Sequence, residues 1–301
     1  MKTDRRTVLL TGVAALAAVT RHSAQTPVSG TASGPAPHRI RVWPGPAPGG
    51  SKGTVKPTVI ERSKDPNVFD RAWLGIVDPT LAIYSPPKPD GSAVLIMPGG
   101  AYQRVVIDKE GEDTARRLMS HGITAVVLTY RLPGDGWDAG RDAPLQDAQR
   151  AVRLLRSGVA GKLDPARIGV LGYSAGGDLA AATAIRHEAR TYEPVDEVDR
   201  LSARPDFAGL MYAAVDMPLR HPDGTVWPPD RTLVSQISAD TPPCFLMHAA
   251  DDGSVPVQTS LSVFTSLRAA KVPAELHVFE EGGHGFGIGM TAGKPVQAWP
   301  S

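Results

Sequence analysis

The chain has 301 residues and carries 32 lysines and arginines against 31 aspartates and glutamates, a formal net charge of +1. This balance argues against a nucleic-acid partner, which would need a basic face, so we expect none. Hydrophobic residues make up 42% and charged residues 21%, which is ordinary for a globular protein, and the length allows one large α/β domain as easily as two small ones.

The first 24 residues have the order of an export signal. Two arginines at positions 5 and 6 precede an apolar run that ends at Val19, and Ser23 and Ala24 then offer a small-residue cleavage site. This order resembles a twin-arginine export signal, and the apolar run is too short to span a bilayer. We expect export to the periplasm or beyond, with no stable membrane association after cleavage.

Residues 25–58 are rich in proline, glycine, serine and threonine, and we expect a flexible leader there, followed by one catalytic domain over residues 59–301. The single cysteine, Cys244, excludes an internal disulfide and most metal sites built on thiolates. It lies in an apolar run and is predicted to be buried. We expect no metal and no other cofactor.

Short apolar runs alternate with amphipathic runs along the rest of the chain. The apolar runs predict strands over residues 39–43, 81–84, 93–97, 124–130, 167–171, 207–212, 244–248 and 274–279. Helices are predicted over residues 112–120, 144–156, 178–185 and 256–270. Residues 213–243 form a long insertion. The alternation predicts an α/β fold with a mainly parallel sheet and helices on both faces.

The sequence GYSAG at residues 172–176 stands between a predicted strand and a predicted helix. G-x-S-x-G in this context is a nucleophile elbow, a turn so tight that its flanking positions need glycine. It would expose the hydroxyl of Ser174 at the end of the sheet. The amide of Ala175 opens the following helix and is predicted to donate to an oxyanion.

A serine hydroxyl needs a base, and the base needs an acid that fixes its tautomer. His284 follows the last predicted strand between glycines, and Asp251 and Asp252 follow the strand before it. The order serine, aspartate, histidine is that of the α/β-hydrolases. The spacing to Pro256 favours Asp252 as the acid, whereas Asp251 is expected to accept loop amides.

The sequence PGGAY follows the strand predicted over residues 93–97, where this fold places a glycine-rich loop. We predict that the amides of Gly100 and Ala101 complete an oxyanion hole with Ala175. An ordinary strand-to-helix turn is the alternative.

Five segments together resemble secreted α/β-hydrolases of the bifunctional feruloyl/acetylxylan esterase-like group. They are WPGPAPG at 43–49, MPGGAY at 97–102, YRLP at 130–133, PLQDAQRA at 144–151 and GGHGF at 282–286. The resemblance implies a serine esterase that acts on substituted plant polysaccharides, such as xylan, or on their oligosaccharides. It implies Ser174 as nucleophile, His284 as base and Asp252 as acid.

Three features depart from that group. Ala101 stands where a third glycine is usual, and its amide is expected to remain a donor only if the backbone there avoids positive φ. Asp178 replaces a histidine after the elbow. The sequence stops at Ser301, where relatives usually carry another helix, and a chain truncated there would leave an apolar sheet face partly uncovered.

Tyr102, Trp137 and Trp227 lie in predicted loops, where they either stack on a sugar or feruloyl ring or anchor the loops by packing.

Two functions other than ester hydrolysis stay open. A peptidase of the prolyl-oligopeptidase type shares the elbow and the residue order, although about 90 residues before the oxyanion loop are too few for its propeller. An inactive hydrolase fold that binds carbohydrate is the other.

Overall fold

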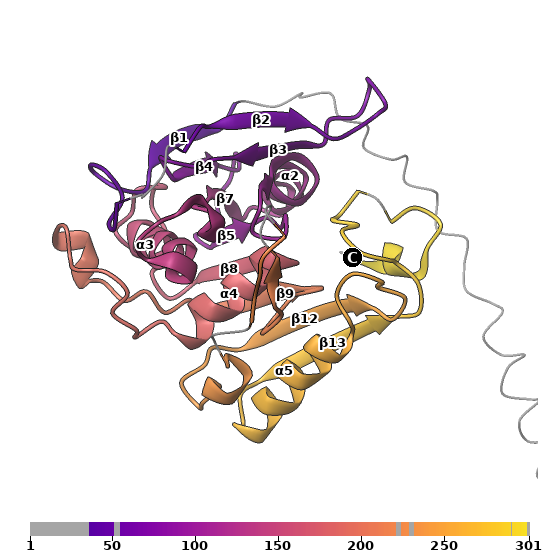
Figure 1. Cartoon of the computed structure of the whole chain (residues 1–301). Helices are drawn as coiled ribbons and strands as arrows, with labels where there is room; N and C mark the ends of the chain where they lie inside the picture. Colours follow the sequence, from indigo (N-terminus) through magenta and orange to yellow (C-terminus); the bar gives the residue numbers. More distant parts are fainter. Residues whose placement is uncertain (1–35, 51–54, 221–223, 229–231, 290, 300–301) are drawn as a thin grey trace, which may run out of the picture.

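The computed structural model describes residues 36–50, 55–220, 224–228, 232–289 and 291–299, so the predicted export signal lies outside the described residues. The centre of the fold is a sheet of eight strands (Figure 1). From one edge to the other they are β1 (His38–Arg41), β4 (Thr80–Tyr84), β7 (Thr124–Thr129), β5 (Ala93–Met97), β8 (Ile168–Tyr173), β9 (Phe207–Met211), β12 (Cys244–Ala249) and β13 (Ala274–Phe279).

The six strands from β7 to β13 run parallel to one another, and β4 and β1 add antiparallel pairs at one edge. Every residue of β5 and β7 is buried, because both faces of the sheet are covered at its centre. Cys244 is buried in β12, as the sequence predicts. The mainly parallel α/β sheet expected from the sequence is confirmed.

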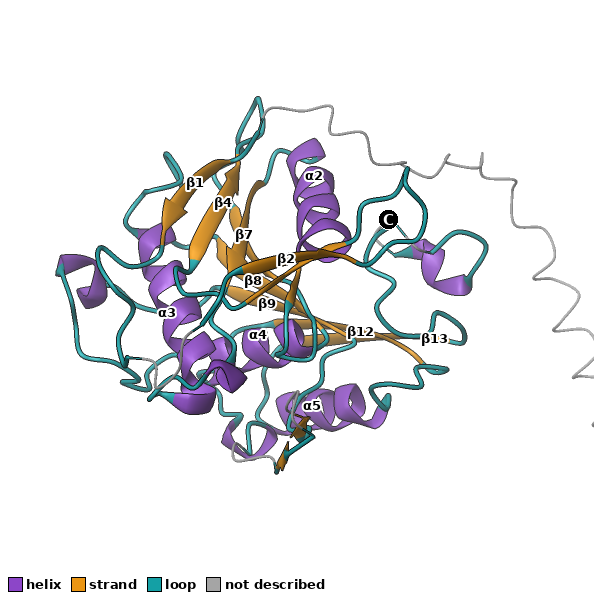
Figure 2. Cartoon of the chain, turned by 45° about the horizontal axis from the view of Figure 1, so that its top comes forward, coloured by secondary structure: helices purple, strands orange, loops and turns teal. Residues whose placement is uncertain are grey.

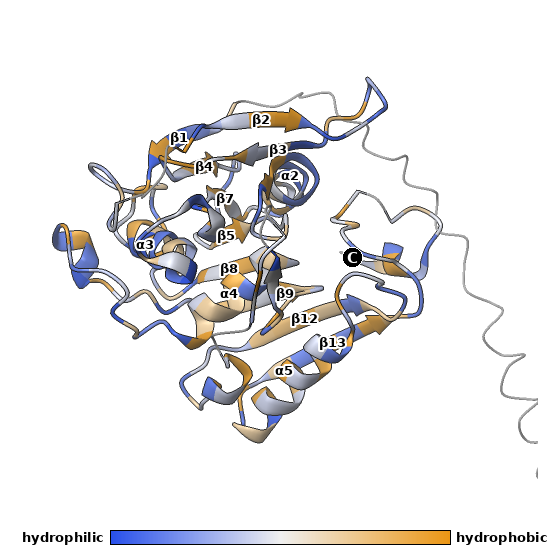
Figure 3. Cartoon of the chain, in the orientation of Figure 1, coloured by the Kyte–Doolittle hydropathy of each residue, from blue (hydrophilic) through white to orange (hydrophobic). Residues whose placement is uncertain are grey.

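Helices cover both faces of this sheet (Figures 1 and 2). On one side lie α3 (Ala143–Arg156), α4 (Ala175–Ile185) and α5 (Gln258–Ala269), and on the other lies α2 (Asp113–Ser120), which continues a π-helical turn over Asp108–Glu112. The first ten residues of α4 are all buried, which explains why its sequence is alanine-rich and lacks a polar face (Figure 3).

Two small sheets were not predicted. One is antiparallel and consists of β2 (Thr58–Glu61), β3 (Arg71–Leu74) and β6 (Val105–Val106). The other pairs β10 (Leu219–Arg220) with β11 (Val226–Trp227) inside the predicted insertion. These strands are two to four residues long and give little periodic signal, because alternation needs several residues to show.

A buried ion pair ties the start of the domain to the main sheet. The guanidinium of Arg131 donates to the carboxylate of Asp147 at 2.8 and 3.0 Å, and both side chains are inaccessible to solvent. The indole of Trp43, which is buried, donates to the same carboxylate at 2.8 Å. Both β1 and Trp43 lie within the predicted leader, so this part of the leader belongs to the folded domain.

The face of the sheet beside α2 is partly uncovered. An apolar groove of about 590 Å³ lies over β8, β9, β12 and β13. Phe245 on its floor stacks on Trp299, with ring centres 5.5 Å apart, and Phe207 at its edge is exposed.

The turn between β8 and α4 brings three stretches of backbone into contact. A Cβ atom on Gly172 would lie 2.0 Å from the carbonyl oxygen of Gly176. A Cβ atom on Gly176 would lie 2.0 Å from the carbonyl oxygen of Met97, at the end of β5. Neither distance is compatible with a side chain, so both positions require glycine.

We expect Gly176→Ala to lower the free energy of unfolding by at least about 3 kcal/mol, because the new methyl group must push β5 away from α4. Gly45→Ala is the matched control, since a Cβ atom there meets nothing within 4 Å. Its effect should stay within about 1 kcal/mol. Urea denaturation followed by circular dichroism measures both, and equal stability of the two variants would contradict the packing argument.

Candidate active site

Ser174 lies between β8 and α4 in a conformation that residues with side chains rarely adopt, with φ 53° and ψ −119°. The amide of Ser174 donates to the carbonyl of Met211 at 3.0 Å, and its own carbonyl accepts the amide of Asp178. These bonds hold the turn while the side chain points away from the sheet. The Oγ atom of Ser174 lies 2.9 Å from Nε2 of His284.

His284 is held from its other ring nitrogen by Asp252, with 2.7 Å between Nδ1 and Oδ2. The Asp252 side chain is inaccessible to solvent, and the His284 side chain is 23% exposed. A proton on Nδ1 that is donated to this carboxylate leaves the lone pair of Nε2 free to face Ser174. The structure therefore brings the three residues chosen from the sequence into the arrangement of a Ser–His–Asp triad.

The carboxylate of Asp252 is surrounded by donors. Its Oδ1 atom accepts the amides of Ser254 and Val255 at 2.8 and 2.9 Å, and Nε2 of the buried His248 lies 3.3 Å from Oδ2. Burial raises the pKa of Asp252, but the hydrogen bonds from His248, His284 and the two amides outweigh it and hold the pKa well below its usual value. Asp252 therefore stays ionised at neutral and mildly acidic pH.

Asp251 points elsewhere, as expected from the sequence. Its Oδ1 atom accepts the amides of Gly282 and Gly283 at 2.9 and 2.7 Å. The hydrogen bond from Gly283 is the main reason that the pKa of Asp251 is lowered. Asp251 thus fixes the backbone just before His284, while Asp252 contacts the imidazole.

Glu110 is a site residue that the sequence reasoning missed. It is 3% exposed, and its Oε2 atom accepts the amide of Gly99 at 2.7 Å. Its Oε1 atom accepts the hydroxyl of Tyr212 at 2.9 Å, and that hydroxyl in turn accepts the amide of Gly287 at 3.0 Å. Glu110 therefore connects the turn after β5 to the loop that carries His284.

Tyr212 also packs its ring edge-on against His284, with ring centres 5.1 Å apart. Burial raises the pKa of Glu110, against the opposing effect of the hydrogen bond from Gly99. In the sequence, Glu110 stands among charged residues before a helix, a pattern typical of a solvated helix face. Only the π-helical turn over Asp108–Glu112, which has no clear sequence signal, brings it inside.

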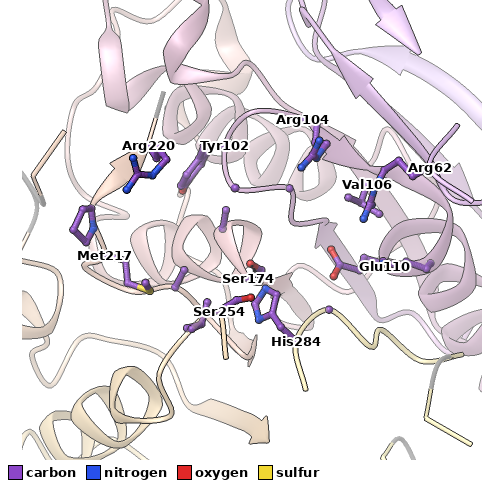
Figure 4. A pocket seen from close by; sticks show the side chains of 18 residues that line it. Arg62, Tyr102, Arg104, Val106, Glu110, Ser174, Met217, Arg220, Ser254 and His284 are labelled. Carbon is purple, nitrogen blue, oxygen red and sulfur yellow. Dashed lines mark hydrogen bonds between the residues drawn. The ribbon is translucent and has the colours of Figure 1, made fainter. Parts of the chain in front are cut away.

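The predicted oxyanion residues lie beside Ser174. Gly100, Ala101 and Ala175 line a cavity of about 370 Å³ together with Ser174 and His284 (Figure 4). Within the described residues, the amides of these three predicted donors form no hydrogen bond with another protein group. All three are therefore available to a ligand.

The backbone of this loop differs from the expectation. Ala101 has φ +57°, so the condition stated from the sequence, that its amide remains a donor only if positive φ is avoided, is not met. Tyr102 also has φ +57°, and Gly100 has φ +134°. The loop keeps a left-handed course that glycine adopts most easily, at a cost of about 1–2 kcal/mol for each residue with a side chain. Even so, Ala101 lines the cavity and its amide forms no hydrogen bond within the described residues, so the positive φ leaves this amide available to a ligand.

The three aromatic residues predicted as substrate contacts have different surroundings. Tyr102 lines the cavity, and its hydroxyl donates to Asp178 at 2.9 Å. Trp137 does not line the cavity. It is buried, and the guanidinium carbon of Arg131 lies 5.2 Å from its ring centre, so the prediction of a substrate contact is wrong and Trp137 is a packing residue. Trp227 ends β11, and its side chain lies outside what the structure describes.

The described residues contain neither a metal-binding cluster nor a membrane-spanning helix. No group of three or more histidine, cysteine, aspartate and glutamate side chains is arranged to hold a metal ion in that part of the chain. In the same residues, no helix is both long and apolar enough to cross a membrane.

The sheet, the serine at the strand–helix elbow, and the acid and histidine on later loops define an α/β-hydrolase. Comparison with known families identifies the family within this class. The BD-FAE family model matches residues 81–209, which include the oxyanion loop and the elbow, and the prolyl oligopeptidase family model matches residues 221–298. The chain belongs to the BD-FAE family of α/β-hydrolases.

Three relatives illustrate the similarity. An acetylxylan esterase of Xylanibacter ruminicola is 30% identical over 69% of this chain, and the match spans 44% of that protein. The crystal structure of an acetyl ester-xyloside bifunctional hydrolase from Caldicellulosiruptor lactoaceticus is 31% identical with a TM-score of 0.67, covering 89% of this chain and 94% of that one. The propionate-bound esterase Est2 of Thermogutta terrifontis is 26% identical with a TM-score of 0.59, covering 76% and 85%.

We expect Asp252→Asn to lower kcat for a chromogenic ester by up to about ten-thousand-fold, because an amide at this position favours the wrong imidazole tautomer. Asp251→Asn is the matched control in the adjacent position, and it should cost less than about tenfold, since it acts only through the loop before His284. Steady-state kinetics on two variants of equal circular dichroism decides between them. A larger loss for Asp251→Asn would reverse the assignment.

Glu110→Ala is expected to lower kcat by about 10- to 100-fold, because it leaves the Gly99 amide and the Tyr212 hydroxyl unpaired at a typical cost of 1–3 kcal/mol. Glu110→Gln keeps one acceptor and one polar partner and should recover part of that loss. The measurement is kcat and KM for p-nitrophenyl acetate in both variants. If folded Glu110→Ala kept the wild-type kcat, Glu110 would have no positioning role.

Proposed function

We propose that this protein is a serine carboxylic-ester hydrolase that removes short acyl groups from substituted xylan or its oligosaccharides. The observation that supports it best is the chain of hydrogen bonds from Asp252 through His284 to Ser174, which ends at a cavity lined by three amides that form no hydrogen bond within the described residues. This arrangement supplies a nucleophile, a base with a fixed tautomer and donors for a developing negative charge.

In the proposed acylation, Oγ of Ser174 attacks the carbonyl carbon of the ester while Nε2 of His284 takes the hydroxyl proton. The negative charge moves to the carbonyl oxygen, which the amides of Gly100, Ala101 and Ala175 stabilise. The tetrahedral intermediate then breaks its bond to the alcohol oxygen, which takes the proton from His284. The product is an acyl group on Ser174 and a free alcohol.

Deacylation repeats these steps with water in place of the serine. His284 removes a proton from the water as its oxygen attacks the acyl carbon, and the same amides bind the oxyanion. Collapse of the intermediate returns the proton to Oγ of Ser174 and releases the carboxylic acid. Throughout, the ionised Asp252 stabilises the imidazolium form of His284.

The substrate class rests on the relatives and on the size of the cavity. Two relatives are named as an acetylxylan esterase and as an acetyl ester-xyloside bifunctional hydrolase, and the structure of a third is described as propionate-bound. A cavity of about 370 Å³ suits a short acyl group such as acetyl together with part of the alcohol. A feruloyl group is the second acyl group that the family likeness supports.

A peptidase of the prolyl-oligopeptidase type is the second candidate, because that family model matches residues 221–298. The matched segment contains Asp252 and His284, which both enzyme classes use in the same chain order. A hydrolysis panel distinguishes the two functions. Ester hydrolysis predicts turnover of acetylated xylan, acetylated xylo-oligosaccharides, methyl ferulate or p-nitrophenyl acetate, whereas peptidase activity predicts turnover of prolyl p-nitroanilides.

We also propose that the protein is exported by the twin-arginine route and acts in the periplasm or outside the cell. The support is the order of charged, apolar and small residues in the first 24 positions. Mass spectrometry of the protein recovered from each compartment tests this proposal. Recovery of only uncleaved protein from the cytoplasm would contradict it.

Ser174→Ala is expected to lower kcat for esters by on the order of a million-fold, because the acyl-enzyme can no longer form. A fluorophosphonate probe should label the wild-type protein at Ser174 and leave the variant unlabelled. The same probe tests whether the fold is an inactive carbohydrate-binding protein, since only an activated serine reacts. A folded variant that kept more than a tenth of the wild-type kcat would overturn the assignment of the nucleophile.

A further inference from the structure

Four cationic side chains line the cavity at Ser174, an unusual concentration for a protein whose net charge is +1. They are Arg62, Arg104, Lys109 and Arg220. Figure 4 shows Arg220 on one side of Ser174 and Arg104 and Arg62 on the other. The one carboxylate among the lining residues is that of Glu110, whose two oxygens are already bonded to Gly99 and Tyr212.

The four cations differ in their ion pairs. Arg62 and Lys109 share a single carboxylate, that of Asp70, at 3.3 and 3.8 Å. Within the described part of the chain, neither Arg104 nor Arg220 has a carboxylate within ion-pair distance. Among the described residues, no carboxylate therefore balances the charge of these two guanidinium groups at the cavity.

The backbone holds both arginines beside the predicted oxyanion loop. Arg104 ends the turn after β5, where its amide donates to the carbonyl of Gly100 at 3.2 Å. Arg220 ends β10, and its carbonyl accepts the side-chain amide of Gln103 at 2.7 Å. Each side chain is thus attached to a segment whose position is fixed relative to the loop.

Neutral acetyl and xylosyl groups can accept hydrogen bonds from these two guanidinium groups but cannot balance their charge. A carboxylate can do both, because the planar fork of arginine matches its two oxygens and because charge in a cleft is focused by the low-dielectric walls. We propose that the preferred ester carries a carboxylate near the scissile bond and that Arg104 and Arg220 bind it. This inference rests on the proposed ester hydrolysis and narrows its substrate class.

The carboxylate has two possible sources, and the substrates distinguish them. On the alcohol side it would belong to a uronic acid unit, which 4-acetoxybenzoate and its neutral methyl ester represent. On the acyl side it would belong to a dicarboxylic acid, which the 4-nitrophenyl monoester of adipic acid and its neutral methyl ester represent. The quantity measured is the ratio of kcat/KM for the anionic ester to kcat/KM for its neutral partner.

Arg104→Gln and Arg220→Gln should each lower this ratio about tenfold for one of the two ester pairs, mainly by raising KM for the anionic ester. The ester pair that responds shows whether the carboxylate lies on the alcohol side or on the acyl side. Arg104→Lys and Arg220→Lys keep the charge and should recover part of the ratio. Raising NaCl from about 50 to 500 mM should lower the wild-type ratio, because salt screens exposed charges. Arg200→Gln is the control, since Arg200 is 77% exposed and pairs with Glu197 away from the cavity.

Differences in the intrinsic reactivity of the esters do not affect this comparison, because the ratio of each variant is compared with the wild-type ratio for the same two esters. Ratios that stay at the wild-type value in both glutamine variants overturn the carboxylate inference and leave ester hydrolysis intact. A fall of the same size in Arg200→Gln also overturns it. If none of the four esters is cleaved by the wild-type protein, the proposed function and this inference fail together.

Discussion

The contact between Gly176 and the end of β5 is the constraint on which the rest of the site depends. A Cβ atom at residue 176 would lie 2.0 Å from the carbonyl oxygen of Met97 and 2.5 Å from that of Pro98. Because no side chain intervenes, the start of α4 lies directly against the turn that follows β5. The amides of Ala175 and Gly100 therefore reach one cavity although 75 residues separate them in the sequence.

His284 reaches that cavity from the far edge of the sheet, and polar contacts rather than a helix hold its loop. Asp251 binds the amides before the histidine, and the Tyr212 hydroxyl binds the amide of Gly287 after it. Phe286 adds an apolar contact, with its ring centre 4.7 Å from that of Tyr212. Glu110 then connects Tyr212 to the turn after β5, so the two halves of the site share one buried network.

The sequence predicts those parts of the structure that leave a local pattern. The buried strands over Ala93–Met97 and Cys244–Ala249 are continuous apolar runs, and GYSAG marks the elbow. The choice of Asp252 over Asp251 follows from spacing to the next helix. The burial of Glu110 could not be predicted from the sequence, because it depends on a π-helical turn and on Tyr212, which lies 102 residues away along the chain. Trp137 likewise stands in a loop, and only the fold shows that Arg131 packs on it.

The carboxylates around His284 respond to acid in a definite order. Burial raises the pKa of Glu110, whereas the hydrogen bonds to Asp252 outweigh its burial and lower its pKa, so Glu110 takes up a proton first as the pH falls. A protonated Glu110 becomes a donor toward Tyr212, and the tyrosine hydroxyl must then turn while it still accepts the amide of Gly287. A falling pH therefore acts on the contacts that position the histidine loop before it acts on Asp252, so the Asp252–His284 hydrogen bond still has its ionised acceptor when Glu110 gains a proton. The hydrogen-bond donors around Asp252 thus keep it ionised while it orients the imidazole. Glu110, which connects the turn after β5 to the histidine loop, is the carboxylate that gains a proton first.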